Sequence, residues 1–270
     1  MEIKRKTIGL ALGSGGPRGL AHIGVIQALL NEKINIDYIA GTSAGALIGG
    51  MYGVERNLLK IENLAHNFSY KDLLEVFSDP QIGSGIIGGK KAVSFLDDII
   101  GSVNIENMAI PFKAVATDLF TAEAVIIDKG SLSEAIRASG SIPLMFQPVK
   151  INDRYLVDGG LSQPVPVETV KKMGADIVIA VNLDHVYFSA LKKGEIKPLM
   201  SFLSVANTSL SILRCNLSIE SAKDADIIVV PDIKYASDIG FNSFINGKDI
   251  IQSGIKGMEK MIPELKKLLN

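Results

Sequence analysis

The sequence predicts a single-domain α/β protein spanning residues 1–270, with a mostly parallel central sheet between two layers of helices. Short, continuously apolar segments alternate with segments whose apolar residues recur at helical spacing. Strands that are apolar at every position are typical of a parallel sheet covered on both faces. Glycine-rich loops follow several of these strands, and no linker-like stretch or internal repeat divides the chain.

The N-terminal part contains two strand–loop–helix units. An apolar strand at Thr7–Leu12 leads into the glycine-rich loop Gly13–Gly19, and Leu20–Leu30 has the apolar spacing of a helix. A second strand, Ile36–Ala40, leads directly into another helix rich in small residues. A further helix is predicted at Asn57–His66.

The remaining elements follow from the same criteria. Ser131 and Glu134 form a capping box, which marks the start of a helix. Pro143 and Pro148 keep the next stretch extended. The glycine-rich loop Ile82–Gly89 lies between two helical pieces and is a candidate mobile lid. The other predicted strands are Phe112–Thr117, Ala124–Ile127, Tyr155–Val157, Ile177–Val181 and Ile227–Val230, and the other predicted helices are Val167–Met173, a long helix around Pro198–Ala222, and amphipathic helices within Lys248–Leu269.

Composition excludes several classes of protein. The formal net charge of −1 and the even mixture of signs provide no surface for nucleic acid. The single cysteine, Cys215, excludes an internal disulfide and has no spacing for a metal site. No apolar run approaches the roughly 20 residues that span a bilayer, and the basic N-terminus lacks a signal-peptide core. We therefore expect a cytoplasmic protein whose membrane contact is at most peripheral and transient.

The most informative motif is Gly41-Thr42-Ser43-Ala44-Gly45, which matches the Gly-x-Ser-x-Gly pattern of a nucleophile elbow. A sharp strand-to-helix turn exposes the serine hydroxyl, and only small residues at the positions of Gly41 and Gly45 let this turn close. The N-terminus of the following helix has positive partial charge, which suits a site where an oxyanion develops. The motif therefore predicts Ser43 as a nucleophile.

A second glycine motif, Gly15-Gly16-Pro17-Arg18-Gly19, follows the first strand and is preceded by Ser14. Successive glycine N–H groups at such a turn bind either a phosphate or an oxyanion. A dinucleotide site would require an acidic residue about 20 residues later, at the end of the second strand, where the serine elbow stands instead. Arg18 either contacts a substrate head group or braces the loop through backbone carbonyls, and the sequence favours bracing.

Asp158 ends the predicted strand Tyr155–Val157 and precedes Gly159 and Gly160. Aspartate before glycine is ordinary turn chemistry when it stands alone. Here, however, ligand sites of open α/β sheets lie at the carboxyl ends of strands, where Ser43 is also expected. A serine nucleophile needs a base, and a carboxylate serves if burial raises its proton affinity. Asp158 is the candidate base.

Four segments in this order resemble the patatin-like phospholipase family in its compact bacterial form. They are the loop Ser14–Gly19, the elbow Gly41–Gly45, the stretch Ala138–Pro143 and the triplet Asp158–Gly160. The resemblance covers nearly the whole chain and is sharpest over residues 8–167. It implies a serine lipid acyl hydrolase of the phospholipase, lysophospholipase or esterase type, acting on an acyl ester without metal or cofactor.

The resemblance also implies the roles of individual residues. Ser43 is the nucleophile, Asp158 is the general base, and the backbone around Gly15 and Gly16 forms the oxyanion region. The family's loop usually opens with glycine, and here Ser14 stands in that position. Because serine keeps a backbone N–H, we expect the oxyanion function to survive this departure.

Two alternatives remain at this stage. His185 follows the predicted strand Ile177–Val181, so the order Ser43, Asp158, His185 matches the Ser-Asp-His triad of α/β-hydrolases. A triad would require the histidine to contact the nucleophile. The same fold also suits a regulatory or adaptor protein with vestigial activity, because a fold does not dictate a function.

Overall fold

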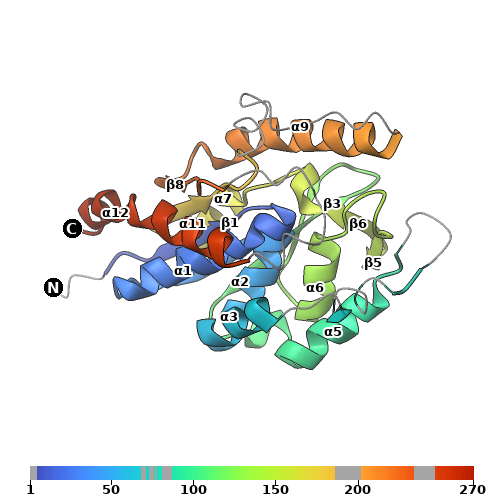
Figure 1. Ribbon diagram of the computed structural model, residues 1–270, viewed down its shortest axis with the longest axis horizontal. Helices are drawn as coiled ribbons and strands as arrows, with labels where there is room; N and C mark the ends of the chain where they lie inside the picture. Colours follow the sequence, from blue (N-terminus) through green and yellow to red (C-terminus); the bar gives the residue numbers. More distant parts are fainter. Residues whose placement is uncertain are drawn as a thin grey trace.

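The computed structural model describes residues 5–67, 71–72, 76, 78–80, 87–185, 202–233 and 247–270 (Figure 1). The described strands are β1 (Ile8–Leu12), β2 (Tyr38–Thr42), β3 (Phe112–Asp118), β4 (Ala124–Ile127), β5 (Val149–Ile151), β6 (Arg154–Asp158), β7 (Ile177–Val181) and β8 (Ile227–Val229). The described α-helices are α1 (Ala21–Asn31), α2 (Ala44–Glu55), α3 (Leu58–Asn67), α5 (Lys90–Ile100), α6 (Leu132–Ser139), α7 (Val167–Met173), α9 (Phe202–Ala222), α11 (Gly247–Glu259) and α12 (Ile262–Leu269). Short 3₁₀ helices are η1 (Gly16–Leu20), η2 (Ile105–Asn107) and η3 (Gly159–Leu161).

These strands form one mixed sheet in the order β5-β6-β3-β2-β1-β7-β8, and β4 pairs with β3. Strands β1, β2, β3, β7 and β8 are parallel, whereas β4, β5 and β6 run antiparallel to their neighbours. Helices α1, α2, α3, α5, α6 and α11 lie on one side of the sheet, and α9 lies on the other side with α7 (Figure 1). The predicted three-layer fold with a mostly parallel sheet is confirmed.

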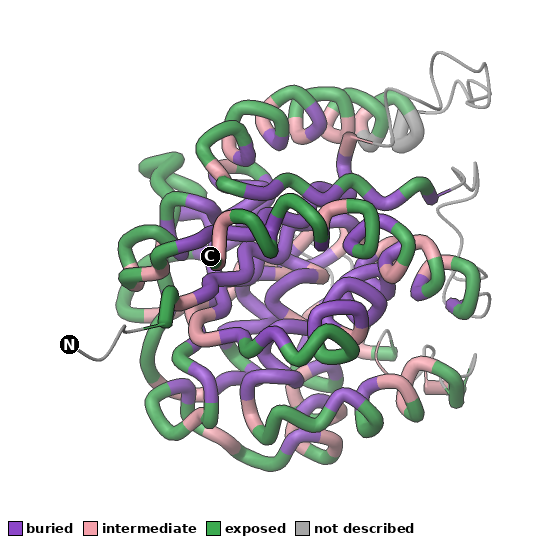
Figure 2. Tube along the Cα trace, turned by 90° about the vertical axis from the view of Figure 1, so that its left-hand side faces the viewer, coloured by how far each residue is buried: buried purple, intermediate pink, exposed green. Residues whose placement is uncertain are grey.

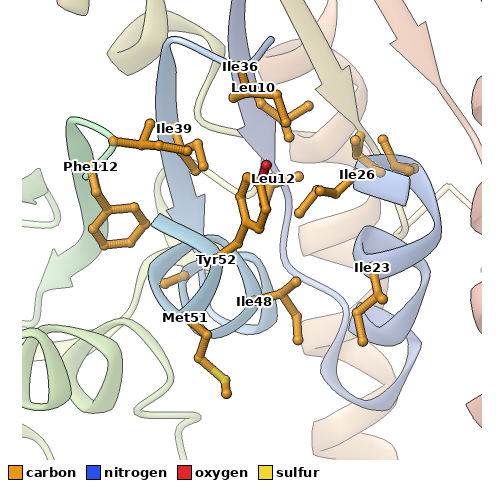
Figure 3. Close-up of a cluster of buried hydrophobic side chains, with 14 of the residues drawn as sticks. Leu10, Leu12, Ile23, Ile26, Ile36, Ile39, Ile48, Met51, Tyr52 and Phe112 are labelled. Atoms are coloured by element: carbon orange, nitrogen blue, oxygen red, sulfur yellow. The ribbon is translucent and has the colours of Figure 1, made fainter. Parts of the chain in front are cut away.

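The two faces of the sheet carry side chains of different size. Because side chains alternate along a strand, Leu10 and Leu12 of β1 point toward α1 and α2, whereas Ala11 points toward α7. In β7, Ile179 and Ala180 show the same division. The larger cluster fills the space around α2 (Figure 3), and buried residues run through the centre of the molecule (Figure 2). The alanine face allows α7 to approach the sheet closely.

Strand β2 lies two residues later than predicted. Asp37 lies just before β2 and accepts a 2.8 Å hydrogen bond from the backbone N–H of Ile8 at the start of β1. Pairing with both neighbouring strands then carries β2 through Gly41 and Thr42. This pairing overrides the low strand propensity of glycine. As a result, Ser43 follows the strand without any intervening residue.

Strand β5 was not predicted, and it changes the direction from which Asp158 arrives. Asn152 and Asp153 have φ of 49° and 63°, the left-handed pair that closes a two-residue hairpin. Strand β6 therefore runs antiparallel to β3, with Asp158 opposite Ala116. Asp158 ends a strand, as predicted, but this strand is one of the antiparallel members of the sheet, because the hairpin turns the chain back along β3.

Several smaller expectations are also corrected or limited. The predicted loop Gly13–Gly19 contains the 3₁₀ helix η1, and α1 begins only at Ala21. Of the candidate lid Ile82–Gly89, residues 82–86 lie outside the described residues, as do residues 198–201 of the predicted long helix. Within the described ranges, no helix combines the length and the hydropathy that crossing a bilayer requires.

Candidate active site

The turn at Ser43 has the geometry of a nucleophile elbow. Ser43 has φ of 54° and ψ of −116°, a conformation that costs a residue with a side chain about 1–3 kcal/mol. A Cβ on Gly41 would lie 2.4 Å from the Gly45 carbonyl oxygen, and a Cβ on Gly45 would lie 2.0 Å from the Leu12 carbonyl oxygen. Only glycine fits at either position. The N–H groups of Ala46 and Leu47 donate to the Ser43 carbonyl, so α2 starts directly at the serine.

The structure brings Ser43 and Asp158 into direct contact. The Ser43 hydroxyl donates to Asp158 Oδ2 over 2.7 Å, and the Gly160 N–H donates to Asp158 Oδ1 over 2.7 Å. Both side chains are buried, with Ser43 8% and Asp158 4% exposed. A Cβ on Gly159 would lie 2.2 Å from the Val115 carbonyl oxygen, so the turn after Asp158 also requires glycine. These contacts fix the orientation of the carboxylate toward the hydroxyl.

Two serines at the C-terminal end of α6 and just beyond it brace this pair. The Ser139 hydroxyl accepts the Ser43 N–H over 2.8 Å and donates to the Val115 carbonyl. The Ser141 carbonyl, just after the helix, accepts the Asp158 N–H over 2.9 Å. The stretch Ala138–Pro143 was recognised only as part of a family pattern, and these bonds give it a structural role. They also show that the Ser43 N–H is already used.

The glycine loop offers N–H groups that remain available. Gly13 donates to Val181 and Ser14 donates to Pro164, but neither Gly15 nor Gly16 donates a backbone hydrogen bond to any other described residue. Gly16 has φ of +55°, and a Cβ there would meet open space. Gly16 and Ser43 line the same cavity. Their positions suit an oxyanion held between the loop and the elbow.

The loop also packs directly against the elbow helix. A Cβ on Gly19 would lie 2.5 Å from the Ala44 Cβ, so only glycine lets η1 approach the start of α2 this closely. Arg18 donates to the carbonyls of Gly15 over 3.2 Å and of Leu183 over 3.0 Å. These bonds match the bracing interpretation of Arg18.

Sequence reasoning missed a buried carboxylate that holds this loop. Asp184 Oδ2 accepts from the Ser14 hydroxyl and, over 2.9 Å, from Nε of Arg214 on α9, while Oδ1 accepts from Nη2 of Arg18 over 3.0 Å. Asp184 is 2% exposed. The sequence did contain one signal, the serine that replaces the usual first glycine of the loop. Its hydroxyl needed a partner inside the fold.

The pKa values of the two buried carboxylates, Asp158 and Asp184, are shifted in opposite directions. Burial raises the pKa of Asp158, against the opposing effects of the Ser43 hydrogen bond and the Arg214 charge. Burial also disfavours the charge of Asp184, but the guanidinium groups of Arg214 and Arg18 outweigh it and lower the pKa of Asp184. Neighbouring acids whose pKa values are pushed apart are typical of a catalytic base beside a structural charge.

No histidine shares a hydrogen bond with the Ser43 hydroxyl among the described residues. His22 is fully buried beneath the glycine loop, where its Nε2 lies 2.8 Å from the Gly13 carbonyl, and burial lowers its pKa to about 4. His185 follows β7, and its backbone N–H donates to the Asn182 side chain over 3.2 Å. The Ser43 hydroxyl contacts a carboxylate directly, so no imidazole stands between them.

An apolar cavity of about 260 Å³ adjoins Ser43. Ile23, Ile48 and Met51 in its wall belong to the cluster in Figure 3. One charged side chain, Arg137, also lines the cavity, and its guanidinium lies over the ring of Phe146 at 4.6 Å from the centroid. The other apolar side chains that line it are Leu20, Ala44, Leu47, Ile61, Leu64, Ala65, Val76, Ala92, Phe95, Leu96, Ile99 and Ile136.

Comparisons with known proteins agree on one family. Residues 10–171 match the family model described as patatin-like phospholipase. An uncharacterised NTE family protein of Mycobacterium tuberculosis is 42% identical over 178 residues, which are 66% of this chain and 49% of that protein. Lysophospholipase NTE1 of Candida albicans is 32% identical over 188 residues, 68% of this chain and 14% of that protein. The chain thus spans about half or less of the length of these relatives.

A solved structure is similar over nearly the whole chain. VipD from Legionella pneumophila aligns with a TM-score of 0.60 and 13% identity, covering 96% of this chain and 67% of that one. At this identity, the similarity shows the fold alone.

Proposed function

Because the chain belongs to the patatin-like phospholipase family, we propose that it is a carboxylic ester hydrolase that cleaves fatty-acyl esters of lipids through a Ser-Asp dyad. The observation that carries this proposal is the 2.7 Å hydrogen bond from the Ser43 hydroxyl to the buried Asp158 carboxylate. A strained serine at a helix start, with an apolar cavity beside it, supports the same assignment.

In the proposed mechanism, Asp158 takes the hydroxyl proton as Ser43 attacks the ester carbonyl. The developing oxyanion lies near Gly16 and is stabilised by the N–H groups of Gly15 and Gly16. Protonated Asp158 then gives its proton to the leaving alcohol. In the second half, Asp158 takes a proton from water as the water oxygen attacks the acyl-enzyme, and it returns this proton to the Ser43 oxygen as the bond between Ser43 and the acyl group breaks and the carboxylic acid is released.

The raised pKa of Asp158 is what this chemistry requires. An exposed aspartate is a weak base, because its ordinary pKa lies far below that of a serine hydroxyl. Burial brings the carboxylate closer to the proton affinity that develops on the hydroxyl in the transition state. The direct Ser43 to Asp158 contact favours this dyad over a triad through His185.

The cavity supports an acyl chain as the substrate part nearest the serine. Its wall is almost entirely apolar, and burying a methylene group there is favourable by about 0.8 kcal/mol. The name of the Candida relative, a lysophospholipase, and its match to this chain support a lipid ester. We therefore propose fatty-acyl lipids rather than short polar esters as substrates.

Incubating the protein with a mixed lipid extract is expected to release free fatty acids, as measured by mass spectrometry. Protein first reacted with a fluorophosphonate, which blocks a reactive serine, should release none. If Ser43 is labelled by the probe but no lipid in the extract loses an acyl chain, the hydrolase proposal fails and a regulatory protein with a vestigial site is favoured.

We also propose that the protein touches lipid surfaces transiently through the turn after β3. Leu119 and Phe120 in this turn are 49% and 78% exposed. Strands β2 and β3 are parallel, and β3 extends past the level of Thr42, so this turn projects from the sheet edge where Ser43 stands. A lipid surface is the environment in which the proposed substrate occurs.

The Phe120→Ser variant is therefore expected to bind phospholipid vesicles about tenfold more weakly, because burying a phenylalanine side chain is worth about 1.5–3 kcal/mol. Co-sedimentation with vesicles measures this loss, while turnover of a water-soluble ester should stay unchanged. Ile228→Ser is the control, since Ile228 is an exposed apolar residue of β8 at the end of the sheet. Equal vesicle binding by all three proteins would contradict the proposed contact.

A further inference from the structure

Arg214 lies on α9, outside residues 10–171 that match the family model, yet it contacts both halves of the proposed site. Its side chain is 23% exposed. One contact is with the turn that follows the base. A Cβ on Gly160 would lie 2.8 Å from Arg214 Cδ, so the arginine stem lies against the glycine whose N–H donates to Asp158 Oδ1.

The other contact of Arg214 is with Asp184, which joins the two ends of the glycine loop. Ser14, before Gly15 and Gly16, and Arg18, after them, both donate to the Asp184 carboxylate. Two backbone N–H groups that must point at an oxyanion therefore lie between two anchored residues. The Asp184 backbone is fixed as well, because its N–H donates to the Asn182 side chain over 3.1 Å.

The charges of this cluster act on the base. Among the described residues, Arg214 and Asp184 are the charged groups whose fields shift the proton affinity of Asp158, and they do so in opposite directions. Arg214 favours the carboxylate form, and Asp184 favours the protonated form. Neither residue touches the Ser43 hydroxyl in the hydrogen bonds of the described residues, so both act through other groups.

We propose that Arg214 and Asp184 are positioning residues of the active site: Asp184 anchors both ends of the oxyanion loop, and Arg214 holds Asp184 and balances the charge around the base. This inference rests on the proposed hydrolase function. It makes α9 a part of the active site rather than only a cover for the sheet. A structural ion pair alone would predict a loss of stability without a change in the acid–base behaviour of Asp158.

The test is a pH titration of Asp158 in the parent protein and in three variants. The ¹³C NMR signal of the Asp158 carboxyl carbon, in protein labelled at aspartate, reports the midpoint of each titration. The Asp158→Asn protein assigns the signal. Arg214→Gln removes a positive charge, so the Asp158 midpoint should rise by about one pH unit, and Asp184→Asn removes a negative charge, so it should fall. Arg214→Lys keeps the charge and should shift the midpoint by less than half as much as Arg214→Gln.

The acid limb of kcat/KM for a p-nitrophenyl ester should move in the same directions, because only the deprotonated base is active. Thermal unfolding identifies any variant that does not fold. If Asp184→Asn is such a variant, the Arg214→Gln and Arg214→Lys pair decides alone. An unchanged Asp158 midpoint in folded Arg214→Gln overturns the inference. Absence of Ser43-dependent turnover in the parent protein, with the midpoints shifting as expected, overturns the proposed function instead.

Discussion

The Ser43→Ala variant is expected to lose ester turnover by a factor on the order of 10⁶, the size of the effect when a serine hydrolase loses its nucleophile. No acyl-enzyme forms without the hydroxyl, and the residual rate comes from substrate binding and the oxyanion donors. The fold should be retained, because the Ser43 backbone bonds to Ser139 and to the start of α2 do not involve the removed oxygen. Turnover of p-nitrophenyl esters and far-UV circular dichroism measure the two outcomes.

A matched control exists in the same protein. Ser133 is 1% exposed and donates its hydroxyl to the part-buried Asp97 over 2.6 Å, another serine-to-aspartate bond that lies away from the proposed site. It links α6 to α5 and has no contact with the glycine loop among the hydrogen bonds of the described residues. Ser133→Ala should cost about 1 kcal/mol of stability and leave turnover at the parent rate. A Ser43→Ala protein as active as the Ser133→Ala protein would refute the nucleophile assignment.

The Asp158→Asn variant is expected to lower kcat by about 10²–10⁴-fold, the usual contribution of a general base. Asparagine keeps the shape of the site, since its amide can still accept from the Gly160 N–H and donate to the Ser43 hydroxyl. KM should therefore change little. Steady-state kinetics over a pH series measures both parameters, and the acid limb of the parent profile should disappear in the variant.

The same substitution should raise stability at neutral pH. The folded pKa of Asp158 lies above its unfolded value, so the folded state binds more protons in the interval between the two values. Stability then falls as pH rises through that interval, and the full penalty is present above the folded pKa. Asparagine removes the buried charge, so the Tm advantage of Asp158→Asn should be present at pH 7, shrink as the pH falls toward the unfolded pKa, and be absent below it.

Asp97→Asn provides the corresponding control, because Asp97 also accepts a serine hydroxyl but is not part of the proposed site. It should keep the parent kcat and the parent acid limb. An Asp158→Asn protein with unchanged kcat would exclude a role for Asp158 as the base. An unchanged stability difference across the pH series would show that its burial carries no penalty.

Local sequence signals were sufficient for the elbow and for most elements. The requirement for glycine at Gly41 and Gly45 is set by backbone atoms a few residues away or on the neighbouring strand, so a short motif carries it. The continuously apolar strands likewise reveal burial on both faces. Such patterns could not predict at which residue β2 begins. That residue follows Asp37, whose carboxylate accepts a hydrogen bond from the backbone of Ile8, 29 residues earlier in the chain.

Neither the direction of β6 nor the side chain that binds Ser14 could be predicted from local sequence patterns. Asn152-Asp153 is a plausible turn pair, but a hairpin also needs the strand Val149–Ile151, whose short, part-exposed sequence carries little periodicity. Asp184 gave no signal of its own, since an aspartate after a buried strand is usually solvated. Its partners come from residues 14, 18 and 214, and no local pattern joins positions that far apart.

The bonds that Ser14, Arg18 and Arg214 donate to Asp184 also affect when the active site is completed during synthesis of the chain. Ser14 and Asp184 are separated by 170 positions in the chain, and the bond from Arg214 closes only after α9 has been synthesised. Contacts of such long range form late in folding, because the loop between them must first be closed. A nascent chain that already contains Ser43 and Asp158 would therefore still lack the anchors of the glycine loop, and we expect it to become competent for the proposed hydrolysis only after residues 184–214 have emerged from the ribosome.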